Sequence, residues 1–191
     1  MEDIIEVIKS RRSIRRYKEE KIPRATVIEI LEAGRWAPSS TNNQPWRFVV
    51  IDDETIIQQV ASESMAFGIN LFVRYAPLII VIYTFATHRW VEVDCGICAE
   101  NMMLEAHSLG VGSCFIGAFN ESGVKNILGI SANAHVIGLI TFGFPAEVKG
   151  THARLSLEEL VSFNGVSDNV TPPSFVRRLI LGIGSKLFQR R

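Results

Sequence analysis

An uninterrupted apolar run near the middle of the sequence constrains the fold more than any other feature. Residues 78–83 read Leu-Ile-Ile-Val-Ile-Tyr, and four of these six side chains are β-branched. A run of this length without a polar residue is typical of a strand that is covered on both faces. We therefore expect a sheet with helices on both sides and residues 78–83 as a central strand.

The remainder of the chain alternates between strand and helix patterns. Alternation, turn residues and helix-end signals predict the following segments. Strands are expected at 48–51, 78–83, 113–116 and 136–142, and helices at 3–10, 23–34, 54–62, 92–109, 121–128 and 157–161. This order is typical of folds that mix helices with a sheet, although it does not decide the order of the strands.

Composition limits the class of protein. With 191 residues, 47% of them hydrophobic, the chain can bury a full core as one domain. The formal net charge is zero, so no overall field favours nucleic acid. The first residues place acids inside the early apolar run, unlike a secretory signal, and three cysteines favour a reducing compartment. We expect a soluble, cytoplasmic protein.

A polar loop at residues 36–48 is the first candidate for function. It reads W-A-P-S-S-T-N-N-Q-P-W-R-F, with eight polar or proline residues in a row. Two prolines stiffen the backbone, and a preformed loop of hydroxyls and amides loses less entropy on binding. Clusters of this kind are also common in plain surface loops, so the loop alone leaves both interpretations open.

A basic cluster follows the expected first helix. Residues 11–17 read R-R-S-I-R-R-Y. Guanidinium groups bind phosphate with paired hydrogen bonds, and a serine hydroxyl can complete such a site. The alternative is a solvated helix end, where basic residues interact favourably with the helix dipole.

The two stretches together resemble the nitroreductase family of FMN-dependent oxidoreductases. In that family an N-terminal helix ends in R-x-S-x-[KR], and a later loop reads P-S-S-x-N-x-Q-P-W; both motifs are present here in the same order. The resemblance extends over residues 1–155. It implies an α+β fold with a central mixed β-sheet flanked by helices, and an intertwined homodimer with FMN in the subunit interface.

The resemblance also assigns cofactor contacts to particular positions. It implies that the first motif binds the phosphate and the ring of FMN and that the loop reaches the flavin from the second subunit. The first group is Arg11, Arg12, Ser13 and Arg15, and the second is Pro38, Ser39, Ser40 and Asn42. Arg12 replaces a histidine of some relatives. Gln44 and Trp46 are expected to hold the loop rather than to touch the cofactor.

Three further segments match the family less closely. Asn70 corresponds to an asparagine that bonds the pyrimidine ring, and Ile116 and Gly117 to a strand end whose amides face flavin N5. Gly117 would permit that approach because it lacks a Cβ, although a glycine can also simply end a strand. Arg154 matches the arginine of a K-x-R-L segment that returns to the phosphate, with His152 in place of the lysine.

The resemblance implies a reaction as well. NADH or NADPH would reduce the flavin at N5 and leave, after which a quinone, a nitroaromatic or a similar acceptor would be reduced in ping-pong turnover. The chemistry belongs to the cofactor, so no acid or base side chain is named. Two alternatives remain. One is a relative that reductively dehalogenates its substrate or that modifies flavin itself, and the other is a flavin-binding regulatory or storage protein without turnover.

Other chemistries find less support. Cys95 and Cys98 form a C-x-x-C, which can be a redox pair or half a metal site, but no second C-x-x-C follows and the pair is expected mid-helix. We interpret both as small core residues. The sequence has no phosphate-binding G-x-x-x-x-G-K-[ST], no G-x-G-x-x-G and no G-x-S-x-G, which argues against nucleotide-triphosphate, Rossmann and hydrolase sites.

The C-terminal residues form a separate problem. Residues 169–191 contain five basic side chains, no acidic ones and many large apolar residues. A helix on a membrane surface and an arm around the partner subunit both fit this composition. Two glycines weaken a continuous helix, so we favour the arm. The expected organisation is an FMN-binding domain at 1–155 and a C-terminal extension at 156–191.

Overall fold

A computed structural model describes residues 3–64 and 70–166. The chain divides into two compact units, Met1–Lys149 and Gly150–Arg191, and each is considered by itself. The basic tail at 169–191, which carries the predicted arm, lies outside the described residues. The elements of the first unit are α1 (Ile4–Ser10), α2 (Arg24–Arg35), η1 (Ser40–Asn42), β1 (Trp46–Ile51), α3 (Glu54–Ser64), η3 (Leu71–Tyr75), β2 (Leu78–Thr84), α4 (Val91–Ser108), β3 (Gly112–Ile116), α5 (Glu121–Leu128) and β4 (His135–Gly143).

The four strands form one sheet in the order β1-β2-β4-β3. All three ladders are antiparallel, so the four strands do not form the predicted mixed sheet; among the described residues, parallel pairing occurs only as an isolated bridge between Ser13 and Ser113, outside the strands. The expected central strand is confirmed, because β2 is paired on both edges. Strand β1 begins at Trp46, two residues before the predicted start, because Trp46 pairs with Thr84 and is buried.

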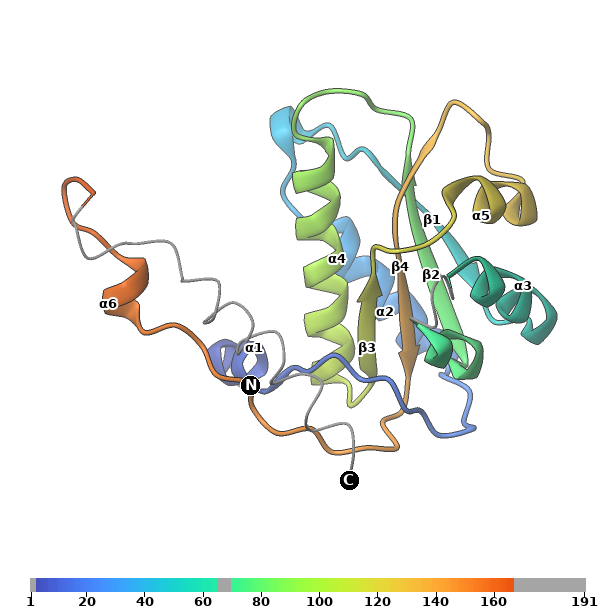
Figure 1. Ribbon diagram of the computed structural model, residues 1–191, viewed down its shortest axis with the longest axis horizontal. Helices are drawn as coiled ribbons and strands as arrows, with labels where there is room; N and C mark the ends of the chain where they lie inside the picture. Colours follow the sequence, from blue (N-terminus) through green and yellow to red (C-terminus); the bar gives the residue numbers. More distant parts are fainter. Residues whose placement is uncertain (1–2, 65–69, 167–191) are drawn as a thin grey trace. The chain divides into compact units, whose positions relative to one another are not determined.

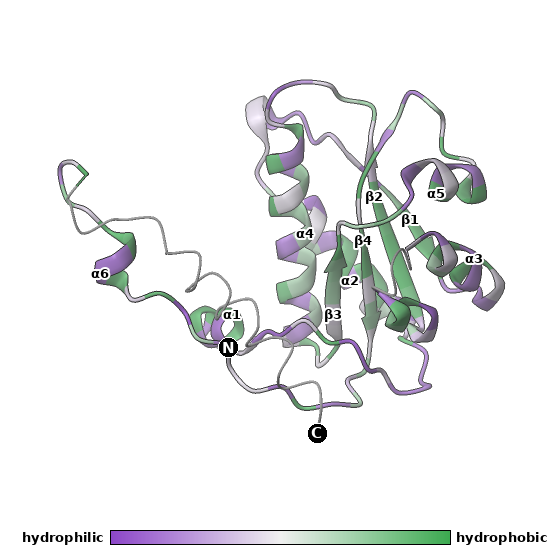
Figure 2. Cartoon of the chain, in the orientation of Figure 1, coloured by the Kyte–Doolittle hydropathy of each residue, from purple (hydrophilic) through white to green (hydrophobic). Residues whose placement is uncertain are grey.

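Strand β2 explains why the chain needs an uninterrupted apolar run. Leu78, Ile80 and Ile82 pack into one core together with residues of α2 and α4. Ile79 and Val81 point to the other face and join a core with α3, α5 and η3. Figure 1 shows α2 and α4 on one face of the sheet and α3 and α5 on the other, and Figure 2 shows the hydrophobic strands between them.

The predicted ends of α4 are close to the observed ones. Gly110 has a φ of +75°, and its N–H donates to His107 O while Val111 N donates to Ala106 O at 2.8 Å. This is the left-handed glycine that commonly ends a helix. Helix α2 lies close to α4, because a Cβ at Gly34 would sit 2.7 Å from Met102 Cγ. Helix α4 is therefore a fixed support, and both candidate motifs contact it.

The second unit contains α6 (Leu157–Leu160) among its described residues. Ser156 precedes this helix and forms a capping box with Glu159, in which each side chain accepts from the other residue's backbone N–H. No helix in the described part of the chain combines the length and apolar character needed to cross a bilayer.

Candidate functional site

The basic cluster lies across the start of strand β3. Ile14 N donates to Ser113 O at 2.9 Å next to the Ser13–Ser113 bridge, and the Ile14 side chain is buried. A Cβ at Gly112 would lie 2.8 Å from Ile14 Cβ, so only glycine allows this close approach. The backbone that carries the cluster is thus fixed against the sheet.

Tyr17 fastens the same segment from the opposite side. Its hydroxyl donates to Ile14 O at 2.7 Å and lies 2.7 Å from Thr141 Oγ1 on β4. Burial raises the pKa of Tyr17 far above its ordinary value, so the hydroxyl keeps its proton at any physiological pH. The Tyr17 hydroxyl therefore remains able to donate to Ile14 O.

The three candidate arginines have different environments. Arg11 Nε lies 3.3 Å from Glu100 Oε1 of α4, and the Arg15 guanidinium lies over the Phe72 ring, 5.7 Å from its centre. Arg12 Nη1 donates to Lys9 O and Arg11 O, the carbonyls at the end of α1. That geometry matches the helix-end alternative for Arg12, whereas Arg11 and Arg15 reach away from α1.

Lys149 joins this cluster, and the sequence interpretation missed it. Its Nζ donates to Ser13 O at 2.8 Å and lies 3.2 Å from Glu147 Oε1, while Arg15 N donates to that same oxygen at 2.8 Å. Lys149 therefore adds a third cationic group beside Arg11 and Arg15. The sequence offered one signal for Lys149. The family motif has a lysine at the position of His152, and Lys149 lies three residues before it.

Three further predicted residues, Asn70, Ile116 and Gly117, lie around the C-terminal end of β3. Asn70 has left-handed backbone, and its amide nitrogen donates to Ser64 O at 3.2 Å and Ala118 O at 3.1 Å, which ties η3 to the residues after β3. The Ile116 side chain is buried, so only its backbone can face a ligand. A Cβ at Gly117 would meet just one ring carbon of Phe115, at an ordinary 3.7 Å. Packing within the chain does not require a glycine there, which leaves its exposed backbone open to a ligand.

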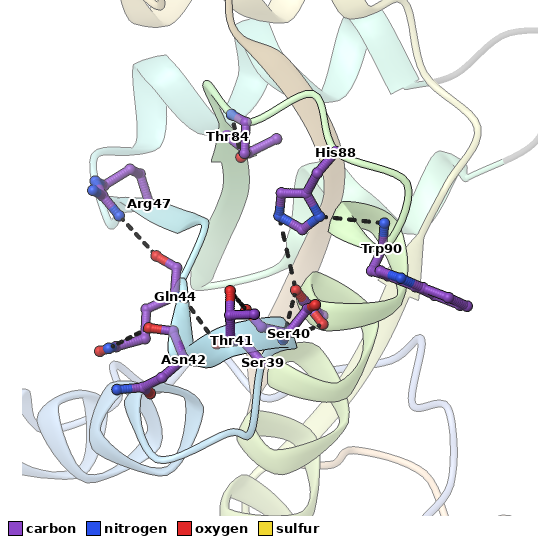
Figure 3. A network of polar contacts seen from close by, with 11 residues as sticks. Ser39, Ser40, Thr41, Asn42, Gln44, Arg47, Thr84, His88 and Trp90 are labelled. Carbon is purple, nitrogen blue, oxygen red and sulfur yellow. Dashed lines mark hydrogen bonds and ion pairs between the residues drawn. The ribbon is translucent and has the colours of Figure 1, made fainter.

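The polar loop is held in an uncommon conformation. Thr41, Asn42 and Gln44 all have positive φ values, between 46° and 57°. Each such non-glycine residue costs about 1 kcal/mol, and clusters of them are typical of functional sites. Hydrogen bonds inside the loop maintain this shape: Gln44 N donates to Ser39 Oγ at 2.9 Å, and Gln44 Nε2 to Asn42 O at 3.1 Å (Figure 3).

Gln44 and Trp46 behave as expected for residues that hold the loop. The Gln44 side chain donates to Asn42 O within the loop, and Trp46 is buried in the core. Ser39 and Ser40 are half-buried, while Pro38 and Asn42 are exposed. The loop is also fastened to α4, since Ser40 N donates to both carboxylate oxygens of Asp94 at 3.2 Å.

The two motifs lie at different ends of α4 within one chain. The loop contacts Asp94 in the first turn of the helix, whereas the segment around the basic cluster meets it at Glu100 and, through Ser10, at His107. At 1.5 Å per residue these contacts are roughly 9 and 20 Å further along the axis. Figure 1 shows the same separation, with the loop at the start of α4 and the N-terminal segment near its end. One chain does not bring its two motifs together.

Arg154 and His152 belong to the second unit. The return of Arg154 to a phosphate stays a prediction, because the two units are described separately.

The cysteines are core residues. Cys95, Cys98 and Cys114 are all buried and none forms a disulfide. Burial, with Asp94 nearby, raises the pKa of the Cys95 thiol to about 11, and burial beside Cys95 raises that of Cys98 to about 12. Burial also raises the pKa of Cys114. No group of His, Cys, Asp or Glu side chains able to hold a metal ion occurs in the described part of the chain.

These raised pKa values predict slow alkylation. At pH 8 a thiol with a pKa near 11 is ionised in about one molecule in a thousand, and the thiolate is the reacting form. Iodoacetamide at pH 8 should therefore leave the native thiols of Cys95 and Cys98 unmodified and label both in urea, as read by intact-mass spectrometry. The native rate should increase as the pH is raised towards 11. Rapid labelling of the native pair at pH 8 would instead support the redox interpretation.

Comparisons with known proteins test the predicted family. The model of the nitroreductase family matches residues 8–144, which include the basic cluster, the polar loop and all four strands. The chain belongs to the nitroreductase family. The matched range covers both motifs.

Individual members agree with this assignment. An NADH dehydrogenase of Thermus thermophilus is 30% identical over 189 residues, with 79% of this chain and 91% of that protein covered. An NADPH-flavin oxidoreductase of Vibrio harveyi is 28% identical, with 86% and 75% covered. The structure of an FMN-dependent nitroreductase from Clostridium difficile superposes with a TM-score of 0.78 at 29% identity, covering 85% of this chain and 99% of that one.

Proposed function

We propose that this nitroreductase-family chain is an FMN-dependent oxidoreductase that takes electrons from NADH or NADPH. The observation that carries the proposal is that one chain holds both a fixed cationic cluster and a polar loop with left-handed backbone. A cluster of this kind suits a phosphorylated, electron-rich ligand, and the loop offers hydroxyl and amide groups without further ordering. The relatives that are named for flavin or FMN support this choice of cofactor.

The residues present fit FMN by their chemistry. Arg11 Nε is buried and lies 3.3 Å from Glu100 Oε1, and this ion pair orients a guanidinium whose remaining N–H groups would bind the phosphate. Ser13 lies beside it, and Lys149 adds charge at the same position. Arg15 and the open backbone of Gly117 would face the ring, where positive charge stabilises the reduced form.

Bound FMN would supply the redox chemistry, accepting hydride at N5 from the nicotinamide and delivering it to a quinone, nitroaromatic or similar acceptor in ping-pong turnover. The chain's own residues bind and orient the cofactor and tune its charge. No side chain of the cluster is needed as an acid or base.

We further propose that the active form is a homodimer in which each loop completes the site of the partner. The outer face of α4 exposes Val93 and Ile97, and a Cβ at the adjoining Gly96 would meet nothing within 4 Å. Two copies of this face that pack antiparallel about a two-fold axis bring the start of one α4 to the end of the other. This arrangement carries the loop of one chain to the cluster of its partner. The extension at 156–191 is proposed to contribute further contacts as an arm.

A colour test separates the proposed enzyme from its alternatives. Purified protein should be yellow with bound FMN, and anaerobic NADH or NADPH should bleach it on the timescale of turnover. Addition of a quinone or a nitroaromatic should then restore the colour. Yellow protein that neither nicotinamide bleaches would favour a flavin-binding protein without turnover, and colourless protein that refuses added FMN would contradict the proposal altogether.

A further inference from the structure

A buried carboxylate outside both family-like motifs fastens the polar loop. Asp94 is only 4% exposed and lies in the first turn of α4. Its two oxygens both accept from Ser40 N–H at 3.2 Å. Ser40 is the residue immediately before the left-handed pair Thr41 and Asn42. The contact therefore acts at the point where the loop leaves ordinary backbone geometry.

Burying this carboxylate costs free energy, which indicates that its contact with the loop is functionally important. A buried charge needs hydrogen-bond donors or an opposite charge to replace water. The positive end of the α4 dipole contributes, because Asp94 lies in its first turn. Asparagine or serine could have accepted from one backbone N–H with less desolvation, so two accepting oxygens directed at a single amide suggest that the loop must be held firmly.

His88 supports Asp94 from the segment between β2 and α4. Its Nδ1 accepts from Trp90 N at 3.3 Å, so the neutral ring carries its proton on Nε2. Nε2 is buried without a hydrogen-bond partner in the described part of the chain and lies 4.0 Å from Asp94 Oδ2. Figure 3 shows the imidazole above the loop, close to Ser40. The ring thus covers the carboxylate and directs an N–H towards it.

We propose that Asp94, backed by His88, is a positioning residue that holds the loop at residues 38–44 in the conformation that receives FMN. This inference rests on the proposed function, because the loop's ligand is the FMN of the partner subunit. Asp94 itself does not touch the cofactor. It acts through the Ser40 amide, and its loss should release the strained backbone that follows.

The first experiment measures how firmly the loop is held in protein without cofactor. Amide hydrogen exchange is measured on the peptide that spans Ser40 in FMN-free protein of the wild type and of Asp94→Ala, Asp94→Asn and Asp53→Ala. Asp94→Ala should accelerate exchange in this peptide by about tenfold, because one hydrogen bond to a charged acceptor is lost. Asp94→Asn keeps one neutral acceptor oxygen and should fall between Asp94→Ala and the wild type. Unchanged exchange in Asp94→Ala would overturn the proposal.

Asp53→Ala is the matched control. Asp53 Oδ1 also accepts a backbone N–H, that of Ile56 at 3.0 Å, but it lies at the start of α3. Its replacement should lower the melting temperature without changing exchange at Ser40 or the affinity for FMN. An equal effect of Asp53→Ala on both readings would show that Asp94 acts through general stability, which contradicts a positioning role.

The second experiment reads cofactor binding. FMN fluorescence titration should give a Kd about tenfold higher for Asp94→Ala, with kcat restored to near the wild-type value at saturating FMN and part of the loss recovered in Asp94→Asn. His88→Ala should weaken FMN binding when it is introduced into the wild type, and it should raise the Kd little further when it is introduced into Asp94→Ala. Additive effects would remove His88 from the proposal, and an unchanged Kd in Asp94→Ala would overturn it. If the wild type binds no FMN, the proposed function fails, while the exchange experiment still tests the contact between Asp94 and Ser40.

Discussion

Replacing Arg11 by alanine should weaken FMN binding by about a hundredfold. A guanidinium that binds phosphate through charge-assisted hydrogen bonds contributes about 3 kcal/mol when two such bonds form. Arg11 is already oriented by Glu100 and lies on backbone fixed to β3, so little ordering is needed when phosphate binds. Fluorescence titration of the cofactor-free variant with FMN measures the effect, and the variant should be colourless when it is purified.

Two further variants make this result specific. Arg11→Lys keeps the charge but loses the planar fork, and it should fall between alanine and the wild type. Arg16→Ala removes the same charge from an exposed position in the same cluster, and its Kd should stay within about twofold. If Arg16→Ala weakened FMN binding as much as Arg11→Ala does, the net charge of the cluster rather than a defined phosphate contact would explain its affinity for FMN.

The sequence predicted the elements because their signals are local. The apolar run of β2 and the helix-end signals act on neighbouring residues, and the structure agrees on these features. Helix α5, for example, starts at the predicted Glu121, and the Asn120 side chain before it accepts Gly123 N–H. The sheet order and the antiparallel ladders were not predicted, because pairing depends on packing between distant segments. The bulge between Ile82 and Tyr83 is one such non-local detail.

The candidate site was predicted only where it is carried by contiguous motifs. The cluster and the loop were found from their own residues, but the contacts that fix them come from elsewhere in the chain. Lys149 lies far from Ser13 in sequence, and Asp94 lies far from Ser40, so neither pair forms a motif. The left-handed residues of the loop are equally hidden, because Thr41 and Gln44 are not types that favour positive φ. The phosphate contact of Arg12 stays a prediction, and its Nη1 donates to carbonyls at the end of α1.

A complementation experiment should give the second large effect. Arg11→Ala disables the cluster, and the double variant Ser39→Ala/Asn42→Ala disables the loop; each homodimer alone should hold little FMN. If each site takes its cluster from one chain and its loop from the other, a mixed dimer has one site with both defects and one site with none. Differently tagged chains, co-expressed and purified through both tags, should therefore bind about half as much FMN as the wild type and regain about half of its NAD(P)H-dependent activity.

The arrangement of α4 is the reason to expect this recovery. Within one chain, the loop contacts Asp94 and the N-terminal segment contacts Glu100 and His107, so the two motifs are held apart by a rigid helix. A site built within a single chain would leave one defect in every site of the mixed dimer, and no FMN would be regained. A mixed dimer as colourless as its parents would thus contradict the shared site, even if the wild type proved to be a yellow, active homodimer. Recovery to about half, with the wild-type Kd at the intact site, would require that the two motifs meet across the two-fold axis.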